Sequence, residues 1–364
     1  MCRLGVILLC FFSVMAQAAS VSDYWGHSEF YQAHPEQRAW LAELSSAVRD
    51  KPQPLDQKQP EPVRIGLVYP SNQSSSYWVD NEAAFRTRLQ QLGIRFELQA
   101  RYTAPSTELD EQVAQIRELL EWEPDYLVYT LDSVQQKMII ERLMLNHDTK
   151  LILQNITTPL KSWGDRQPFL YAGFDHVEGA QKLAAYFSGE FAGESQYAVL
   201  FRNRGVVSQM RGTGFVQSVD RRHRLVASYY TDSSREGGKQ AARRLLEEHP
   251  GLDYIYACST DVALGVLDAL TLTKPEQPPS VNGWGGGPEE VDELRRGRLD
   301  VVLMRMNDDS AIAMAEAIKR DLEDRPVPQI YSGTFVVLDR SMTDAQIERY
   351  VRLSRRASSG RAVE

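Results

Sequence analysis

Small hydroxyl groups and an indole follow two neighbouring strand-like runs of this sequence. Ser259 and Thr260 come directly after the apolar run 254–258, and Trp284 ends the next such run, 280–284, before three glycines. Parallel strands of an open α/β sheet bind small polar ligands in the crevice beyond their carboxyl ends. We therefore expect these side chains to form one wall of a site for a small polar molecule.

Other residues that can hydrogen-bond, stack or carry charge follow the remaining strand-like runs in the same way: Gln73, Ser75, Trp78, Asn155, Arg211 and Arg305. Each has an ordinary structural alternative, because serines cap helices, asparagine favours turns and a single arginine is usually solvated. Their shared position beyond the ends of the strands is the stronger observation.

The arginines and indoles indicate what kind of ligand would fit. Arg305 directly follows an apolar strand-like run, where free solvation is difficult, so we expect it to pair with Asp308, Asp309 or an anionic ligand. Trp78 and Trp284 are expected to present exposed stacking surfaces. Two arginines, two indoles and several neutral hydrogen-bonding groups suit a small, hydroxyl-rich ligand that carries negative charge.

The sequence lacks the patterns of common catalytic, metal and nucleic-acid sites. The six histidines lie on separate segments without metal-ligand spacing, and no P-loop, GxSxG or HExxH motif occurs. With 41 Lys+Arg against 49 Asp+Glu, the net charge of −8 carries no footprint of nucleic-acid binding. We therefore predict a binding protein with no catalytic residues, no metal and no cofactor.

Residues 1–18 have the pattern of a secretory signal peptide, with Arg3 ahead of an apolar core and a small-x-small cleavage site at 16–18. An uncleaved membrane anchor is the alternative interpretation. Cleavage would leave Cys258 as the single cysteine, which excludes an internal disulfide. Its place within a strand-like run favours a buried structural cysteine over a catalytic thiol.

The chain beyond the signal divides into an arm and two lobes. Residues 19–62 combine several aromatic residues, a helix predicted at 35–48 and a Pro-rich link, which we interpret as an N-terminal arm and linker. From residue 63 onward, apolar strand-like runs alternate with helical segments, which requires parallel strands with right-handed crossovers. This pattern predicts an α/β fold of two doubly wound parallel-sheet lobes joined by a hinge.

The order of the elements sets the predicted boundaries. The N-terminal lobe comprises residues 63–171 plus about 304–325, and the C-terminal lobe comprises 172–303 plus about 326–364, with a single strand at 331–337. Several crossings between the lobes would form a hinge that closes around a ligand.

These features resemble the type I periplasmic binding proteins of the ribose/galactose group and, within it, the LuxP-type receptors for the quorum-sensing signal autoinducer-2. The resemblance covers nearly the whole chain after residue 18. It is carried by long, specific runs: Tyr24-Trp25-Gly26, Val68-Tyr69-Pro70, Gln73-x-Ser75-x-Tyr77-Trp78, 151–159, 254–265, 281–287 and 304–309. It implies a bilobed fold of this class and a location in the periplasm.

The resemblance also implies a ligand. In these receptors the ligand is a furanosyl borate diester, formed when borate esterifies a hydrated sugar-like diol, so boron enters only as part of the ligand. The residues implied to line the site are Gln73, Ser75, Trp78, Asn155, Arg211, Thr260, Trp284 and Arg305. A tetrahedral borate ester carries one negative charge, which two guanidinium groups can neutralise through charge-assisted hydrogen bonds.

A partner is implied as well. Receptors of this type regulate the periplasmic domain of a LuxQ-type sensor histidine kinase, so the protein would meet the membrane only through that kinase. The sequence departs from the family pattern at 202–208 and 271–279, which we expect to lie outside the ligand-binding set.

Other functions are compatible with parts of the pattern. A sugar-binding subunit of an ABC importer has the same fold, although such proteins usually place carboxylates at the ring hydroxyls, where this sequence offers Arg211 and Arg305. A secreted enzyme acting on a small diol is disfavoured by the lack of an acid–base pair. A transcriptional repressor of the same fold is excluded by the signal peptide and the lack of a basic DNA-binding head.

Overall fold

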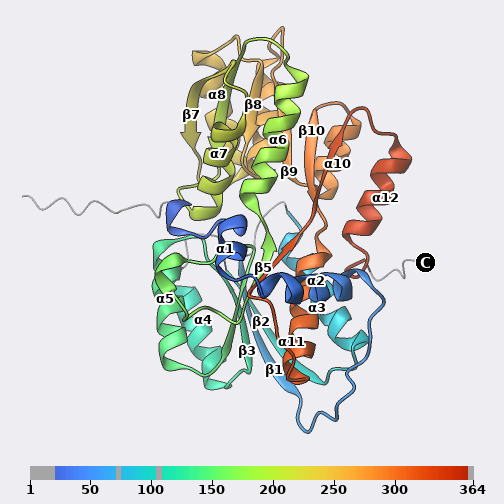
Figure 1. Ribbon diagram of the computed structural model, residues 1–364. Coiled ribbons are helices and arrows are strands. Elements are labelled where there is room, and N and C mark those ends of the chain that lie inside the picture. Colours follow the sequence, from blue (N-terminus) through green and yellow to red (C-terminus); the bar gives the residue numbers. More distant parts are fainter. Residues whose placement is uncertain (1–20, 71–74, 104–108, 360–364) are drawn as a thin grey trace, which may run out of the picture.

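The computed structural model describes residues 21–70, 75–103 and 109–359, so the predicted signal peptide lies outside the described residues. The described chain forms two lobes, each built around a six-stranded sheet (Figure 1). Helices flank both sheets. The predicted α/β architecture of two doubly wound sheets is therefore confirmed.

The N-terminal lobe, lower in Figure 1, contains a parallel sheet with the strand order β11-β5-β4-β3-β1-β2. Its strands are β1 (Val63–Pro70), β2 (Phe96–Thr103), β3 (Tyr126–Thr130), β4 (Lys150–Gln154), β5 (Leu170–Phe174) and β11 (Ile330–Gly333). Its helices, with those of the arm, are η1 (Val21–Asp23), α1 (His27–Ala33), α2 (Gln37–Arg49), α3 (Tyr77–Gln91), α4 (Leu109–Glu121), α5 (Val134–Asn146), η2 (Lys161–Trp163) and α11 (Asp308–Leu322).

The C-terminal lobe contains the second sheet, in the order β12-β10-β9-β8-β6-β7, and only the pair β10–β12 in it is antiparallel. Its strands are β6 (Ser195–Phe201), β7 (His223–Tyr230), β8 (Tyr254–Ala257), β9 (Ser280–Gly285), β10 (Val301–Arg305) and β12 (Phe335–Asp339). Its helices are α6 (His176–Glu190), α7 (Val206–Ser218), α8 (Arg235–Glu248), α9 (Thr260–Thr273), α10 (Pro288–Arg295) and α12 (Asp344–Ser354).

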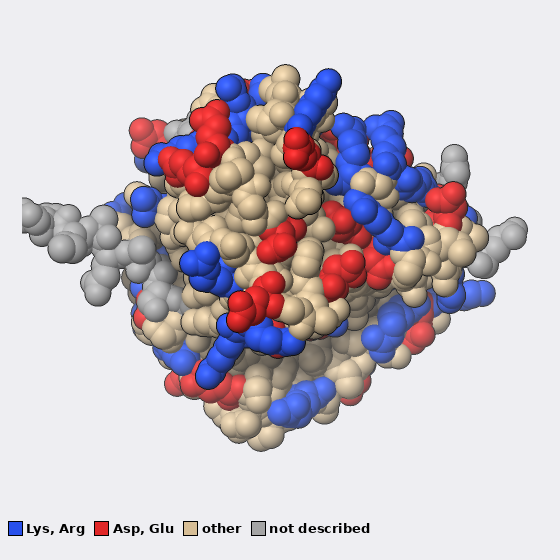
Figure 2. Space-filling view, turned by 90° about the horizontal axis from the view of Figure 1, so that it is seen from above, with Lys and Arg blue, Asp and Glu red and all other residues tan. Residues whose placement is uncertain are grey.

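The surface of the molecule seen from above carries charges of both signs. Lys and Arg side chains alternate there with Asp and Glu, with uncharged surface between them (Figure 2). A mixed surface of this kind favours solubility over the attraction of one highly charged partner.

The central strands are apolar along their whole length because helices cover both faces of each sheet. Every residue of β3 and of β10 is buried. A strand buried on both faces loses the alternation of apolar and polar residues that a half-exposed strand shows. The polar side chains are therefore concentrated at the strand ends, which is where the two lobes meet.

The described chain crosses between the lobes three times. It passes from β5 to α6, from β10 to α11 and from β11 to β12. Helix α11 belongs to the first lobe, since it packs against α2, α3 and β5. Three segments that cross between two lobes can act together as a hinge, as the sequence predicts.

The last crossing corrects a predicted boundary. The single strand predicted at 331–337 is two strands in different sheets, because β11 pairs with β5 whereas β12 pairs with β10, and Thr334 lies between them. The β11 residues therefore belong to the first lobe, although the prediction places everything after about 326 in the second. A continuous apolar run in the sequence does not indicate where the chain passes from one sheet to the other. In addition, the sequence pattern predicted no strand at the position of β5 and no helix at the position of α10.

The N-terminal arm packs on the first lobe. Tyr24 forms a β-bridge with Leu160, and the backbone amide of Trp25 donates to the carbonyl of Pro159 (2.8 Å). Helix α2 packs against α11, and its Leu44 and Val48 are buried in the main core. The aromatic and aliphatic residues of the arm are thus covered by the lobe itself.

The C-terminal segment also returns to the first lobe, although α12 packs in the core of the second. The guanidinium of Arg355 donates to Ser76 Oγ (2.7 Å), beside the start of α3. Arg356 forms an ion pair with Asp309 (2.6 Å), in the first turn of α11. The end of the chain therefore adds contacts between the lobes next to the hinge.

Asp308, which also contacts the C-terminal segment, leads to a prediction about how stability depends on pH. Its Oδ2 accepts hydrogen bonds from the amides of Ala357 (2.6 Å) and Ser358 (2.8 Å), and burial raises the pKa of the carboxyl to about 6. In the unfolded chain this pKa is about 3.9. The folded state thus binds the proton more tightly, so the resulting stabilisation is complete below pH about 4 and is lost as the pH rises through about 6.

We predict that Asp308→Asn removes this dependence, because the amide oxygen still accepts from the backbone but no charge is buried. Relative to wild type, the free energy of unfolding of the variant should gain on the order of 2–3 kcal/mol between about pH 4 and pH 7. Urea unfolding across this range measures the difference, with Asp56→Asn at an exposed position as the control. Parallel curves for wild type and Asp308→Asn would contradict the assignment.

Candidate functional site

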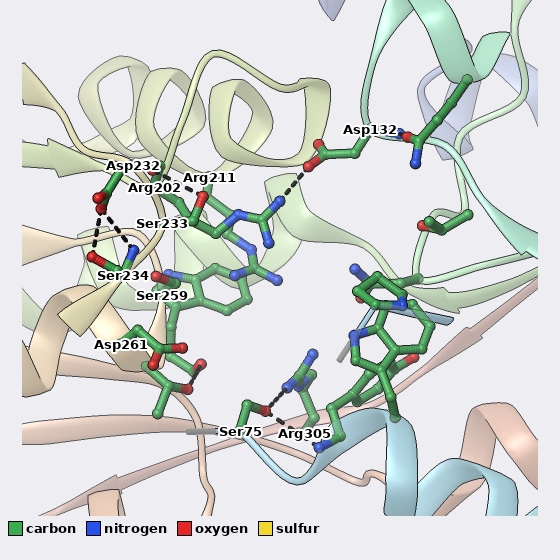
Figure 3. A pocket seen from close by; sticks show the side chains of 18 of the residues that line it. Ser75, Asp132, Arg202, Arg211, Asp232, Ser233, Ser234, Ser259, Asp261 and Arg305 are labelled. Carbon is green, nitrogen blue, oxygen red and sulfur yellow. Dashed lines mark hydrogen bonds and ion pairs between the residues drawn. The ribbon is translucent and has the colours of Figure 1, made fainter. Parts of the chain in front are cut away.

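The carboxyl ends of strands from both sheets meet at a cavity between the lobes (Figure 3). Its volume is about 160 Å³, whereas one water molecule needs roughly 10–15 Å³ on the same measure. The cavity therefore has room for a small organic molecule. It is lined by Pro70, Ser75, Tyr77, Trp78, Gln112, Thr130, Asp132, Gln136, Asn155, Arg202, Arg211, Asp232, Ser233, Ser234, Ser259, Thr260, Asp261, Trp284 and Arg305.

The structure brings the predicted ligand-lining residues together. Those that it describes all line this cavity: Ser75, Trp78, Asn155, Arg211, Thr260, Trp284 and Arg305. Gln73 lies outside the described residues. The predicted residues reach the cavity from strand ends and from the first turns of the following helices, as the rule for open α/β sheets requires.

Arg211 is a buried cation held by neutral groups. Its guanidinium lies over the ring of Trp284, with Cζ 4.1 Å from the ring centre, and Nη1 donates to the carbonyl of Cys258 (2.9 Å). Its Nε donates to Nδ1 of His176 (3.3 Å). Burial, together with the charge of Arg305, lowers the pKa of Arg211 below the usual range of arginine. The site therefore stabilises the positive charge only partly.

Arg305 is a second buried cation that lines the cavity. Its guanidinium lies over the ring of Tyr77 (4.2 Å to the ring centre) and donates to Ser75 Oγ at 3.4 Å, a long hydrogen bond. Its Nε is buried and has no partner among the described residues. Burial lowers the pKa of Arg305 as well.

The predicted pairing of Arg305 with Asp308 or Asp309 is wrong. Asp308 accepts from backbone amides of the C-terminal segment, and Asp309 pairs with Arg356. Both acids lie in the first turn of α11 and are engaged by the end of the chain. The sequence pattern could not show this, because the partners are about 50 residues away along the chain.

Arg211 and Arg305 consequently have no carboxylate partner within 4.0 Å among the described residues. Removing a cation from water without an opposite charge is costly. A ligand that brings negative charge between these two groups would recover this cost. This arrangement is the main electrostatic property of the cavity.

The two indole rings are buried in the walls of the cavity, whereas the sequence predicts that they are exposed. Trp284 is 1% exposed and Trp78 is 6% exposed. The guanidinium of Arg211 covers one face of Trp284, whose Nε1 donates to the hydroxyl of Tyr256 (2.9 Å). Gly179 of α6 makes room for this ring, because a Cβ there would lie 2.6 Å from it. Trp284 therefore holds Arg211 in place as well as lining the cavity.

The loop that contains the glycines after Trp284 binds a buried carboxylate through its backbone amides. Glu290 accepts hydrogen bonds from the amides of Trp284 (2.6 Å), Gly286 (2.8 Å) and Gly287 (3.2 Å). These amides are the ones a phosphate would need, so the three glycines after Trp284 do not form a phosphate site. Glu290 instead fixes the loop that ends β9.

Two neutral groups of the cavity are unsatisfied. The hydroxyl of Ser259 and Oδ1 of Asn155 are buried and have no partner among the described residues. Ser259 precedes α9 but makes no side-chain capping bond, while Asn155 has the left-handed backbone (φ 65°) typical of a turn. Thr260 Oγ1 donates to the carbonyl of Trp284 (2.9 Å). Ser259 and Asn155 are thus available to hydroxyl groups of a ligand.

Cys258 is buried and reduced, as predicted for a structural cysteine. Burial raises the pKa of its thiol to about 12, so the thiolate that catalysis would require is disfavoured.

Several residues of the cavity were not predicted from the sequence, and most of them lie at or just after the ends of strands. Asp132 comes after β3, Arg202 after β6 and Asp232 after β7. The strand-end rule would have found these three, whereas Gln112 and Gln136, on helices, gave no signal. Arg202 also corrects the expectation that the divergent segment 202–208 lies away from the ligand-binding set.

Asp132 joins the two lobes. It forms an ion pair with Arg202, drawn as a dashed line in Figure 3. Its Oδ1 also accepts from the amide of Val207 (2.9 Å), and its carbonyl accepts from Val206 (3.1 Å). Gly205, the residue before α7, has no side chain to cap the helix, and a Cβ there would lie 2.5 Å from Asp132 Oδ1. A carboxylate of the first lobe thus caps a helix of the second.

Residues 65–324 match the periplasmic binding protein domain. The chain belongs to the periplasmic binding protein family. This assignment implies a periplasmic or otherwise extracytoplasmic location. In the part of the chain that the structure describes, no helix combines the length and the apolar character needed to cross a membrane.

Curated relatives of this periplasmic binding protein include ribose import binding proteins. It is 27% identical to the one from Salmonella typhimurium over 160 residues, which are 43% of this chain and 53% of the relative. It is 28% identical to the one from Bacillus subtilis over 130 residues, 35% of this chain and 42% of the relative. The chain spans about half the length of the curated relatives it matches.

Solved structures share the fold over more of the chain. The fructose-binding periplasmic domain of a hybrid two-component system has a TM-score of 0.70 at 17% identity, covering 80% of this chain and 95% of that one. The XylFII–LytSN complex has a TM-score of 0.66 at 14% identity, covering 78% and 100%. A solute-binding protein from Actinobacillus succinogenes 130z with bound D-allose has a TM-score of 0.68 at 17% identity, covering 80% and 100%.

The contact of Asp132 with α7 predicts how closure of this binding protein can be weakened. In Asp132→Ala both the cap and the ion pair are lost, so the closed arrangement should lose about 1–2 kcal/mol and the open population should rise about 5- to 30-fold. Asp132→Asn keeps an acceptor for Val207 and should have a smaller effect.

Single-molecule energy transfer between one dye on each lobe measures these populations. Asp148→Ala, at an exposed position of the first lobe, serves as the control. An unchanged distribution in Asp132→Ala would show that the contact does not hold the lobes together.

Proposed function

We propose that this periplasmic binding protein is a receptor for autoinducer-2 and binds it as the furanosyl borate diester between its lobes. The observation that carries the proposal is the pair of buried guanidinium groups, Arg211 and Arg305, that have no carboxylate partner among the described residues. The specific ligand comes from the resemblance to LuxP-type receptors. It covers the run that contains Arg305 and the runs that contain Cys258 and Trp284, which Arg211 contacts.

The chemistry of the borate diester matches the cavity. Its tetrahedral boron carries one negative charge, and hydrogen bonds from ionised donors are about twice as strong as those between neutral groups. The guanidinium groups of Arg211 and Arg305 line the cavity, while Ser259 and Asn155 leave buried oxygens for the hydroxyl groups of the furanosyl ring. The ligand would thus satisfy the charges and the neutral groups together.

A second candidate is the binding of a neutral sugar for an ABC importer. The ribose import relatives favour it, and so do Asp232 and Asp261, because carboxylates that line a cavity are suited to sugar hydroxyls. Asp232, however, already accepts from the amide (2.9 Å) and hydroxyl (2.6 Å) of Ser234. The unpaired guanidinium groups therefore favour the anionic ligand.

We propose a LuxQ-type sensor kinase as the partner that detects closure. This part rests on the sequence resemblance. It is supported by one structural neighbour, the fructose-binding periplasmic domain of a hybrid two-component system, which has the same fold.

Boron content tests the ligand directly. Protein saturated with autoinducer-2 in borate buffer and then freed of unbound ligand should contain about one boron per chain by elemental mass spectrometry. Protein taken through the same steps in the same buffer without autoinducer-2 measures background boron. A saturated complex without boron above that background, or thermal stabilisation by D-ribose that exceeds stabilisation by the borate diester, would favour the importer subunit instead.

Substitution of the arginines tests the recognition of charge. In Arg305→Lys and Arg211→Lys the positive charge remains but the fork of donors is lost, so affinity for the borate diester should fall about 10- to 100-fold. Calorimetric titration measures the affinity, and Arg222→Lys, at an exposed arginine, is the matched control. Unchanged affinity in both cavity variants would contradict recognition through these guanidinium groups.

A further inference from the structure

His176 lies directly behind the cavity and contacts ligand-lining residues from both lobes, although it is not itself among the residues that line the cavity. We propose that His176 is a positioning residue that orients Arg211 and Asn155 together and, by staying neutral, keeps the charge of Arg211 available to an anionic ligand. This inference rests on the proposed function.

The hydrogen bonds of the ring determine where its proton is. A guanidinium only donates, so Nδ1 of His176 must accept from Arg211 Nε (3.3 Å). Nε2 then carries the proton and donates to the carbonyl of Asn155 (2.9 Å). Both ring nitrogens are satisfied only in this neutral form. The ring therefore connects two specific atoms, one from each side of the cleft.

The surroundings keep the ring neutral. The side chain is 1% exposed, and the guanidinium of Arg211, from α7, contacts the ring directly. Burial, and then the charge of Arg211, hold the pKa of His176 well below its ordinary value, and the charges of Arg305 and Arg202 act in the same direction. A protonated ring would place a fourth cation in this region and would lose its bond from Arg211.

His176 also occupies a mechanically important position. It is the first residue of α6, directly after the chain leaves β5 and crosses to the second lobe. Asp175 caps α6 by accepting from the amides of Val177 (2.9 Å) and Glu178 (3.1 Å), which fixes the backbone at this point. Asn155 belongs to the first lobe and Arg211 to the second. A hinge motion that separates the lobes changes the distance that this one ring spans.

The choice of a neutral acceptor has a consequence for the ligand. An aspartate or glutamate beside Arg211 Nε would orient it equally well but would neutralise its charge. The imidazole fixes the orientation and leaves the charge uncompensated. The same ring holds the backbone of Asn155, whose Oδ1 is buried without a described partner. His176 thus supports both a charged and a neutral contact with one ligand.

The experiment compares two forms of one ligand: autoinducer-2 as its borate diester and the neutral autoinducer-2 present in borate-free buffer. Dissociation constants are measured by calorimetry for wild type, His176→Leu, His176→Gln and His176→Glu. In His176→Leu, affinity for the borate diester should fall about 10- to 100-fold, with a smaller loss for the neutral form. His176→Gln, with a neutral acceptor and a donor, should stay within about threefold of wild type.

His176→Glu provides a second test that does not depend on the behaviour of the leucine variant. It retains an acceptor for Arg211 but neutralises the guanidinium, so it should lose the preference for the borate diester. His223→Leu is the matched control, because His223 is also buried and bonds one side chain, Tyr254 (2.8 Å), and one carbonyl, Phe191 (3.0 Å), away from the cavity. It should leave both dissociation constants unchanged.

The outcomes separate this inference from the function on which it rests. A wild-type protein that does not prefer the borate diester overturns the proposed function and this inference with it. A wild-type protein with that preference, combined with equal losses for both ligand forms in His176→Leu or an intact preference in His176→Glu, overturns the role of His176 alone.

Discussion

The burial of two guanidinium groups without carboxylate partners is the constraint on which the site depends. Arg211 and Arg305 both line the cavity, and each is held by an aromatic face and a neutral acceptor. Cation–π contacts contribute roughly 0.5–2 kcal/mol each, which is less than the cost of removing an ion from water. The rest of that cost is carried by the fold, or recovered when an anion enters. Buried walls, a fixed loop after β9 and a close approach of the lobes are all needed to keep these groups dry.

The lobes are held close by contacts that use the same strand ends as the cavity. Asp132 caps α7 across the cleft, and the C-terminal segment brings Arg355 and Arg356 back to the first lobe beside α3 and α11. Closure is therefore not a separate property from ligand binding. Each motion of the hinge changes the position of Arg202 and of α7, which carries Arg211, relative to the residues of the first lobe. A ligand that favours one position of α7 necessarily favours one arrangement of the lobes.

The sequence predicted the two-lobed α/β fold and fewer than half of the residues that line the cavity, because strand ends are recognisable from short apolar runs. It failed where the outcome depends on distant contacts. The split of 331–337 into two sheets follows from pairing with β5 and β10, and the acids beside Arg305 are engaged by residues from the end of the chain. The burial of Trp284 depends on Arg211 and on the absence of a side chain at Gly179. Local sequence patterns contain none of this information. The rule that residues just after strands line the site, applied also to β3, β6 and β7, would have predicted more of the cavity.

The acids near the cavity explain why its positive charge persists. Glu290 lies close enough to Arg305 to lower its cost of burial, yet its oxygens accept from the amides of Trp284, Gly286 and Gly287. The carboxylate of Asp132 is shared between Arg202 and the amide of Val207 in α7, and Asp232 accepts from Ser234. Each of these carboxylates organises backbone at the end of a strand, and a carboxylate with several donors is a weaker counter-ion for any further cation. The acids therefore build the cavity, while the two guanidinium groups keep the charge that selects the ligand.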